Sequence, residues 1–141
     1  MFVLVVGAGR VGAALATSAL GNGHTVSVLD EDPLSHERLD VELGRSWEEA
    51  GGRFTIGTAL ELDALVESGI EDADVFIAST NGDNTNLVVA QLAKRRFDVP
   101  KVIARVLDPR RAGWYAEQGL HTICPTQIAI EQLTEAAFSE A

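Results

Sequence analysis

The sequence predicts one α/β domain with a doubly wound, mostly parallel sheet of six strands and helices on both faces. Its 141 residues suit a single domain, and 46% hydrophobic with 23% charged residues is a globular composition. Short apolar runs alternate with helical patterns, and strands separated by helices pair in parallel through crossovers. The first apolar run also leads directly into a glycine-rich turn that opens a helix.

The elements follow from this alternation. Strands are expected at Phe2–Val6, 25–29, Arg53–Ile56, 73–78, 101–106 and 121–124. Helices are expected at 11–20, Leu34–Leu43, 60–67, 84–96, 110–118 and Pro125–Phe138. Gly21 and Gly23 end the first helix, and Pro125 starts the last one. Residues 45–52 show the least regular pattern, and Trp47 within them is either a core residue or an anchor for a loop.

Charge and cysteine content exclude several classes of function. The net charge is −10, so binding to nucleic acid or to an anionic membrane would begin from repulsion. The segment 30–74 holds 14 acids and three bases, whereas 94–111 holds seven bases and two acids; solvated helix faces or an interaction surface would explain the acidic block. A single cysteine, Cys124, excludes an internal disulfide and a multi-cysteine metal site. Phe2–Val6 is too short to span a membrane, and a signal peptide's charged start is missing, so we expect a cytoplasmic protein without membrane insertion.

The glycine turn is the clearest functional motif. Residues 7–12 match G-x-G-x-x-G, the dinucleotide-binding turn of Rossmann-type domains: Gly7, Ala8, Gly9, Arg10, Val11 and Gly12. Gly7 would allow the tight turn, Gly9 the approach of a pyrophosphate, and Gly12 the packing of helix on strand. The amides at the helix N-terminus would then face the phosphates. A tight turn without a ligand remains the alternative.

An aspartate after the second strand completes this motif. Asp30 follows Gly12 by 18 residues and is placed to accept the ribose hydroxyls, with Glu31 beside it. The carboxylate would repel a 2′-phosphate, which makes NADP an unlikely ligand, whereas NAD, NADH, ADP and ATP share the same unmodified ribose. A turn or helix-capping role within 30–33 is the alternative for Asp30.

Further candidates follow the other strands, because ligands of open α/β sheets bind beyond the carboxyl ends. Arg10 and Arg105 are the candidate phosphate cations, although a structural salt bridge would explain Arg105 equally well. Thr58 could contact the adenine edge, and the polar run 79–86 is also typical of a helix start. The strand-end candidates are Gly57, Thr58, Ala59, Ser79, Thr80 and Asn81.

These residues, together with the segments 69–86 and 102–106 and the ending from Gly119 to Pro125, resemble the TrkA-N domain, also called KTN or RCK-N. The resemblance covers nearly the whole chain and implies a regulatory subunit of a potassium transporter or channel. Such domains bind NAD(H) or adenine nucleotides without transforming them, and a turn arginine like Arg10 contacts phosphates in ATP-binding members. They form dimers and rings at the inner face of the membrane.

The resemblance also bears on the end of the chain. In this family the last helix often crosses to a partner subunit, with apolar contacts here from Ile128, Ile130, Leu133, Ala137 and Phe138. The alternative is that this helix folds back on its own sheet. Family subunits usually carry a second, C-terminal domain, whereas residues 1–141 read as the nucleotide-binding domain alone.

No catalytic group accompanies the motif. The only tyrosine, Tyr115, has Gly119 where the Tyr-x-x-x-Lys pair of short-chain dehydrogenases has lysine. Cys124 is best explained as a buried thiol, and the three histidines lack metal-ligand spacing with one another. We therefore expect a non-catalytic nucleotide sensor without a metal. The alternative is an NAD-dependent oxidoreductase, or the cofactor-binding domain of one.

Overall fold

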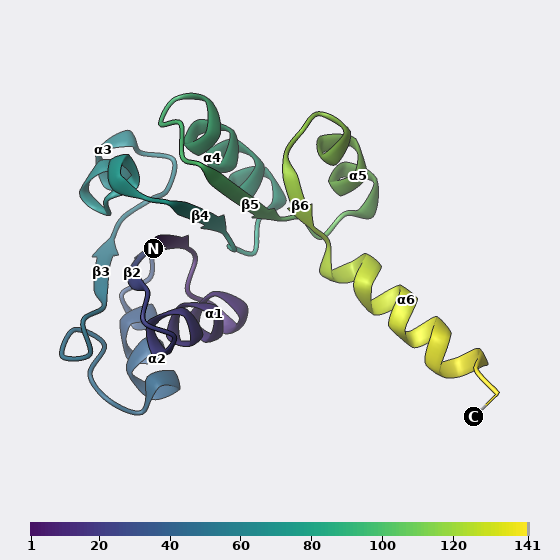
Figure 1. Cartoon of the computed structure of the whole chain (residues 1–141), viewed down its shortest axis with the longest axis horizontal. Coiled ribbons are helices and arrows are strands. Elements are labelled where there is room, and N and C mark those ends of the chain that lie inside the picture. Colours follow the sequence, from purple (N-terminus) through teal and green to yellow (C-terminus); the bar gives the residue numbers. More distant parts are fainter. Residues whose placement is uncertain (141) are drawn as a thin grey trace.

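The computed structural model describes residues 1–140, and within them six parallel strands form one sheet in the order β3-β2-β1-β4-β5-β6 (Figure 1). The strands are β1 Phe2–Val6, β2 Thr25–Asp30, β3 Arg53–Ile56, β4 Val75–Ala78, β5 Lys101–Arg105 and β6 His121–Ile123. The helices are α1 Arg10–Gly21, α2 Leu34–Leu43, α3 Leu62–Glu67, α4 Asp83–Arg95, α5 Pro109–Glu117 and α6 Pro125–Phe138, with a 3-10 turn at Ile70–Asp72. The predicted fold class is confirmed, and the strand order reverses between β1 and β4.

The core has two halves, one on each face of the sheet. Val3 and Val5 of β1 belong to the half that α1 and α2 cover, together with Trp47. Leu4 and Val6 belong to the other half, which contains residues of α3 and α4. Because successive side chains of a strand point to opposite faces, a central strand covered on both sides must be apolar throughout. This explains the unbroken apolar run of Phe2–Val6.

The irregular segment 45–52 joins α2 to β3 and packs into one half of the core through Trp47. Trp47 is completely buried, and its Nε1 donates a hydrogen bond to the Arg53 carbonyl at 2.9 Å. Trp47 is therefore both a core residue and an anchor. The strand expected at 73–78 is shorter than predicted: a 3-10 turn covers Ile70–Asp72, the buried Ala73 follows it, and β4 begins at Val75.

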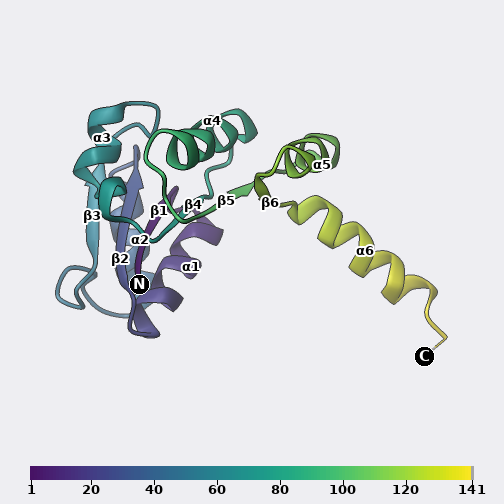
Figure 2. The same ribbon diagram turned by 45° about the horizontal axis from the view of Figure 1, so that its top comes forward.

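The last helix leaves the body of the domain. In Figures 1 and 2, α6 extends away from the sheet, and none of its residues is buried. The structure therefore does not fold this helix back on its own sheet. Apolar side chains along it are exposed, with Leu133 70% and Phe138 82% accessible. Within residues 1–140, no helix has the length and apolar character that a membrane span requires.

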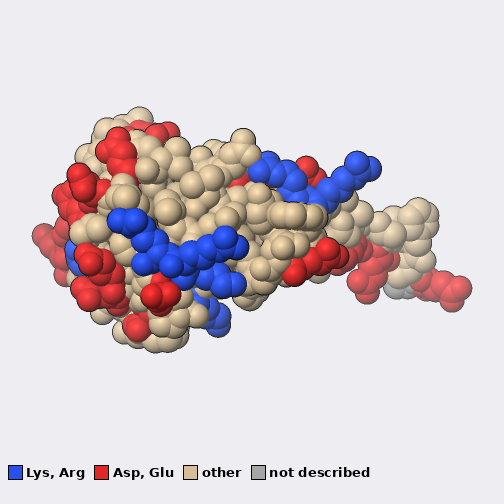
Figure 3. Space-filling model, turned by 90° about the horizontal axis from the view of Figure 1, so that it is seen from above, with Lys and Arg blue, Asp and Glu red and all other residues tan. Residues whose placement is uncertain are grey.

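Charge is unevenly distributed over the surface. On the face seen in Figure 3, acidic side chains gather at the end that carries α3 and again along α6, and basic side chains lie between them. In the sequence, the acids concentrate in the segment 30–74, and Lys94 and Arg95 occupy the last turn of α4. Cations there complement the negative end of the helix dipole.

Candidate functional site

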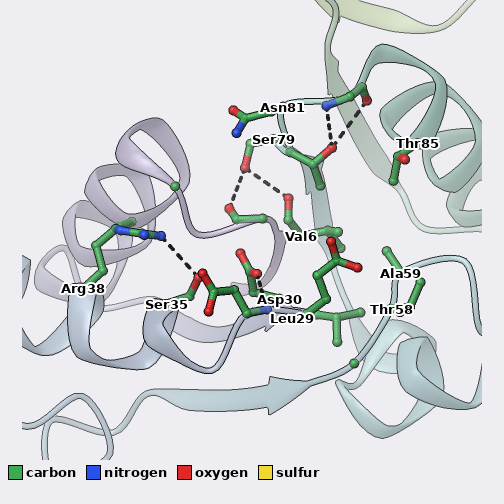
Figure 4. A pocket seen from close by; sticks show the side chains of 18 of the residues that line it. Val6, Leu29, Asp30, Ser35, Arg38, Thr58, Ala59, Ser79, Asn81 and Thr85 are labelled. Atoms are coloured by element: carbon green, nitrogen blue, oxygen red, sulfur yellow. Dashed lines mark hydrogen bonds between the residues drawn. The ribbon is translucent and has the colours of Figure 1, made fainter.

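A cavity of about 870 Å³ opens beyond the carboxyl ends of the central strands, where the strand order reverses (Figure 4). Its volume lies within the roughly 300–1,000 Å³ typical of ligand pockets. Of the predicted site residues, those lining the cavity are Gly7, Gly9, Arg10, Asp30, Glu31, Gly57, Thr58, Ala59, Ser79, Thr80 and Asn81. Four others do not line it: Ala8, Val11, Gly12 and Arg105.

The three glycines of the turn differ in what surrounds them. Gly7 has a φ of +95°, and a Cβ there would meet the Thr80 nitrogen at 2.7 Å. A Cβ on Gly12 would lie 1.8 Å from the Gly7 oxygen, so α1 can approach the turn only with glycine at this position. A Cβ on Gly9 would meet no protein atom within 4 Å. The space next to Gly9 therefore belongs to the cavity, and the packing of the chain does not account for this glycine.

Hydrogen bonds hold the turn from three directions. From β2, the Leu29 carbonyl accepts the Gly7 N–H at 2.9 Å, and Asp30 Oδ2 accepts the Ala8 N–H at 2.7 Å. Just after β4, the Ser79 hydroxyl donates to the Gly7 carbonyl at 3.0 Å and lies 3.2 Å from the Val6 carbonyl. From α2, Arg38 donates to the Ala8 carbonyl. The backbone conformation of the turn is thus fixed by elements that are far apart in sequence.

Asp30 is half-buried, and both of its carboxylate oxygens are hydrogen-bonded. Oδ1 accepts the Asp32 N–H at 2.8 Å, and Oδ2 accepts the Ala8 N–H. The expected turn role is therefore present, together with a link to the glycine motif. Each carboxylate oxygen has two lone pairs, so one remains on each oxygen for hydroxyl groups in the cavity.

The end of β4 is organised by a residue that the sequence analysis did not single out. Asn86 is 1% exposed; its Oδ1 accepts the N–H and hydroxyl of Thr80, and its Nδ2 donates to the carbonyls of Thr80 and Arg105. Arg105 in turn donates from Nη1 to the Thr80 carbonyl at 3.0 Å. No salt bridge to Arg105 is found among residues 1–140, and its buried Nε has no partner there.

Several cavity residues were missed from the sequence: Ser35, Arg38, Gly82 and Thr85. The sequence contains a feature that could have identified Arg38, because it is one of only three bases in the acidic segment 30–74. Ser35 and Thr85 lie on α2 and α4, and their approach to the cavity depends on how those helices pack. Thr85 also falls within the polar run that the sequence analysis noted at 79–86.

Three potential metal ligands lie together elsewhere: His36, Asp40 and Glu48, with their ligand atoms within 4.8 Å of one another. The two ring nitrogens of His36 face different carboxylates, Nδ1 towards Asp40 at 3.7 Å and Nε2 towards Glu48 in a close hydrogen bond. Asp40 also accepts the Trp47 N–H. This arrangement is explained by hydrogen bonds that fasten the segment 45–52 to α2, without an ion.

The cavity presents donors for an anion next to an acceptor for hydroxyl groups. No side chain caps the N-terminus of α1, and its first turn contains no acid, so its amides and the positive end of its dipole are available to an anion. Arg10 adds a cation on the same wall, and Asp30 offers lone pairs to ribose hydroxyls. The open space at Gly9, directly before Arg10 in the chain, would admit a phosphate close to backbone.

Comparison with known proteins gives consistent results. The model of the TrkA-N domain family matches residues 3–126. A Trk system potassium uptake protein TrkA from Streptomyces coelicolor is 41% identical over 133 residues, which are 94% of this chain and 56% of that protein. The chain thus spans little more than half the length of this curated relative.

Solved structures support the fold. The TrkA-N domain of the inner membrane protein ybaL from Escherichia coli superposes with a TM-score of 0.80 at 19% identity, covering 96% of this chain and 95% of that one. The AMP-bound Kef C-terminal domain from Shewanella denitrificans gives 0.74 at 24% identity, covering 99% and 84%. With the family model matching most of its length, the chain belongs to the TrkA-N domain family.

Proposed function

We propose that the cavity binds an adenine nucleotide, NAD(H) or ADP/ATP, and that binding regulates a potassium uptake transporter or channel without chemical turnover. One observation carries the proposal: the uncapped N-terminus of α1 and the Asp30 carboxylate face a single cavity at the point where the strand order reverses. This pairing of amide donors with a ribose acceptor is the basis of dinucleotide binding in such sheets. The AMP in the Kef domain and the potassium uptake role named for the Streptomyces relative support the two halves of the proposal.

In this proposal the ligand lies across the carboxyl ends of the strands. Its phosphates contact the Gly9 amide and Arg10, and its ribose hydroxyls bind the two free lone pairs of Asp30. The adenine lies towards Gly57, Thr58 and Ala59 at the end of β3. Asp30 disfavours NADP, because a 2′-phosphate would be placed against a carboxylate.

The composition of the cavity wall favours a sensor over an oxidoreductase. In the described part of the chain, the lining residues include no tyrosine, lysine, histidine or cysteine that could exchange a proton with a carbonyl substrate. Cys124 instead accepts the Gln127 N–H at the start of α6, and Tyr115 packs against Trp114. The oxidoreductase alternative would need one of the acids that line the cavity, Asp30, Glu31, Asp32 or Glu42, or a group from outside these residues as its proton donor.

Regulation also requires contact between subunits, for which we propose α6. This helix has 14 residues and no buried side chain, and helices of about that length are marginal in water on their own. Ile130, Leu133 and Ala137 recur at intervals of three and four residues and share one face. We propose that this face packs on a second copy of the chain in a homodimer, which can be part of a larger ring held in the cytoplasm by the membrane subunit.

Ligand titrations test the proposal. The protein is incubated with NAD⁺, NADH, ADP, ATP, AMP and NADPH, and the melting temperature and calorimetric affinity are measured. A ligand at 100 times its Kd stabilises the native state by about 2.7 kcal/mol, so binding produces a clear rise in melting temperature. GTP serves as the control for a triphosphate without adenine. The absence of any rise with every adenine nucleotide would refute the proposal, and turnover of NADH with carbonyl compounds would favour the oxidoreductase.

A further inference from the structure

We propose that Arg38 is a positioning residue for the nucleotide phosphates: by holding the Ala8 carbonyl, it fixes the direction of the Gly9 N–H. This inference rests on the proposed nucleotide binding and assigns a role to a side chain outside the glycine motif. Arg38 lies on α2, 30 residues from Ala8, and lines the cavity beside Asp30 and Ser35 (Figure 4).

The geometry of one peptide group carries the argument. Arg38 Nη1 donates to the Ala8 carbonyl at 2.6 Å and lies 3.2 Å from the Ser35 hydroxyl. The peptide between Ala8 and Gly9 is trans, so its C=O and N–H point in opposite directions within one plane. A bond that holds the oxygen therefore also sets where the Gly9 N–H points.

The hydrogen bonds of the turn show why this bond matters. The Gly7 N–H and carbonyl are bound by Leu29 and Ser79, and the Ala8 N–H is bound by Asp30. Within residues 1–140, the bond from Arg38 is the one that holds the Ala8 carbonyl, and the Gly9 N–H has no partner. Gly9 is also the position where the absence of a side chain leaves open space. Hydrogen bonds therefore fix the backbone of the turn as far as the Ala8 carbonyl, and the Gly9 N–H that follows is the first amide available to a ligand. The bond from Arg38 to the Ala8 carbonyl is the last of these bonds along the chain.

Holding this peptide before binding lowers the cost of ordering it on binding. Arg38 should therefore affect the binding of the phosphates, because in the proposed complex the Gly9 amide contacts the phosphates and not the adenosine. Arg38 also carries a positive charge, and no carboxylate within 4.0 Å pairs with it among the described residues. A simple charge effect must therefore be separated from positioning, and salt does this because it screens charges across an exposed site.

The experiment compares two ligands that differ only in their phosphates. Calorimetry measures Kd for ADP and for adenosine in the wild-type chain, Arg38→Ala, Arg38→Lys and Arg45→Ala. Arg45 is the matched control, since it is an exposed arginine just beyond the end of α2 and its removal changes the net charge equally. We expect Arg38→Ala to weaken ADP about tenfold at both low and high salt, the cost of roughly one hydrogen bond to a charged group. Adenosine binding should change less than about twofold, and Arg38→Lys, which keeps a donor, should recover part of the loss.

Nuclear magnetic resonance supplies a second readout that a general loss of stability would not produce. In Arg38→Ala without ligand, the Gly9 amide signal should shift or broaden, while signals from the C-terminal half of α1 stay in place. Equal losses for ADP and adenosine, a loss that disappears at high salt, or an unaffected Gly9 amide would overturn the inference. If the wild-type chain binds no adenine nucleotide at all, the proposed function itself fails, which is a different result from binding that Arg38 does not affect.

Discussion

The Asp30 carboxylate accepts the Ala8 N–H at 2.7 Å and so joins the end of β2 to the glycine turn that follows β1. The two halves of the dinucleotide motif, 22 residues apart in the chain, are therefore in direct contact. Asp30 has two tasks in consequence: it supports the turn, and it presents its remaining lone pairs to the cavity. Substitution at this position should affect both stability and binding.

Asp30→Asn tests both tasks, because it keeps the shape of the side chain but removes its charge and one of its two acceptor oxygens. An amide has one oxygen, so it can accept either the Ala8 or the Asp32 N–H but not both, and its NH₂ faces the other donor. We expect about 1–3 kcal/mol lower free energy of unfolding in urea, and NADH affinity lower by a similar amount. NADPH should lose less than NADH, because the carboxylate no longer repels the 2′-phosphate.

The control is Asp63→Asn, which removes the same charge from an exposed position on α3 outside the cavity. It should leave both measurements near the wild-type values. Wild-type NADH affinity in Asp30→Asn would show that Asp30 is not the ribose ligand.

Two alanine substitutions in the turn should differ in their effects: one should lower nucleotide affinity, and the other should lower the stability of the fold. Gly9→Ala adds a methyl group where no protein atom lies within 4 Å, and Gly9 has a φ of −74°, which alanine adopts readily. Its melting temperature should stay close to that of the wild type while nucleotide affinity falls. Gly12→Ala places a methyl group 1.8 Å from the Gly7 carbonyl and should lower the free energy of unfolding by about 1–3 kcal/mol or more.

The comparison uses thermal unfolding and calorimetry on both variants. A Gly9→Ala protein that melts normally and binds NADH or ADP as the wild type does would remove the case for a phosphate at this amide. A normally stable Gly12→Ala protein would mean that α1 can move away from the turn, contrary to the contact described here.

Local patterns in the sequence were enough to predict the sheet. The strand at Phe2–Val6 and the helix at Leu34–Leu43 have the predicted bounds, because apolar periodicity and the flanking glycines and prolines determine them locally. The strand before residue 79 was expected from residue 73, two residues too early, since Ala73 is buried as a strand residue would be. The spacing of Asp30 from Gly12 was informative because it reflects one βαβ unit.

The supporting contacts of the site could not be predicted in the same way. Arg38 reaches a carbonyl 30 residues away, and Asn86 reaches the Arg105 carbonyl 19 residues away. Neither distance follows from helical or strand periodicity, because both depend on how α2 and α4 pack against the sheet. An asparagine near a helix start is typical of a cap, and only the packed structure shows that Asn86 is buried and bonded on both sides.

Asn86→Ala should be strongly destabilising. It removes the partner of the Thr80 N–H and the Asn86 bond to the Arg105 carbonyl at a buried position, and it leaves the Thr80 carbonyl with Arg105 Nη1 alone. We expect a loss of about 2–4 kcal/mol in the free energy of unfolding, since each stranded buried group costs roughly 1–3 kcal/mol and relaxation recovers part. Asn84→Ala is the matched control on the same helix, because Asn84 is exposed and, among residues 1–140, its side chain bonds only to Arg111. Equal stabilities of the two variants in urea unfolding would contradict the supporting role of Asn86.

A charge on the exposed apolar face of α6 should separate the subunits of the proposed dimer. Leu133→Asp places a carboxylate in a contact that would otherwise bury leucine, and burying an unpaired charge is far more costly than the contact is favourable. Sedimentation should show a dimer for the wild-type chain and a monomer for this variant at the same concentration.

The control is Gln132→Asp, which adds the same charge one residue before Leu133 but off the face shared by Ile130, Leu133 and Ala137, and this variant should remain dimeric. Because α6 has no buried residue in the single chain, the melting temperature of the monomeric variant should depend little on the substitution itself and mainly on the loss of the partner. A wild-type chain that sediments as a monomer at high concentration, or a Leu133→Asp chain that stays dimeric, would show that this face of α6 does not join two copies.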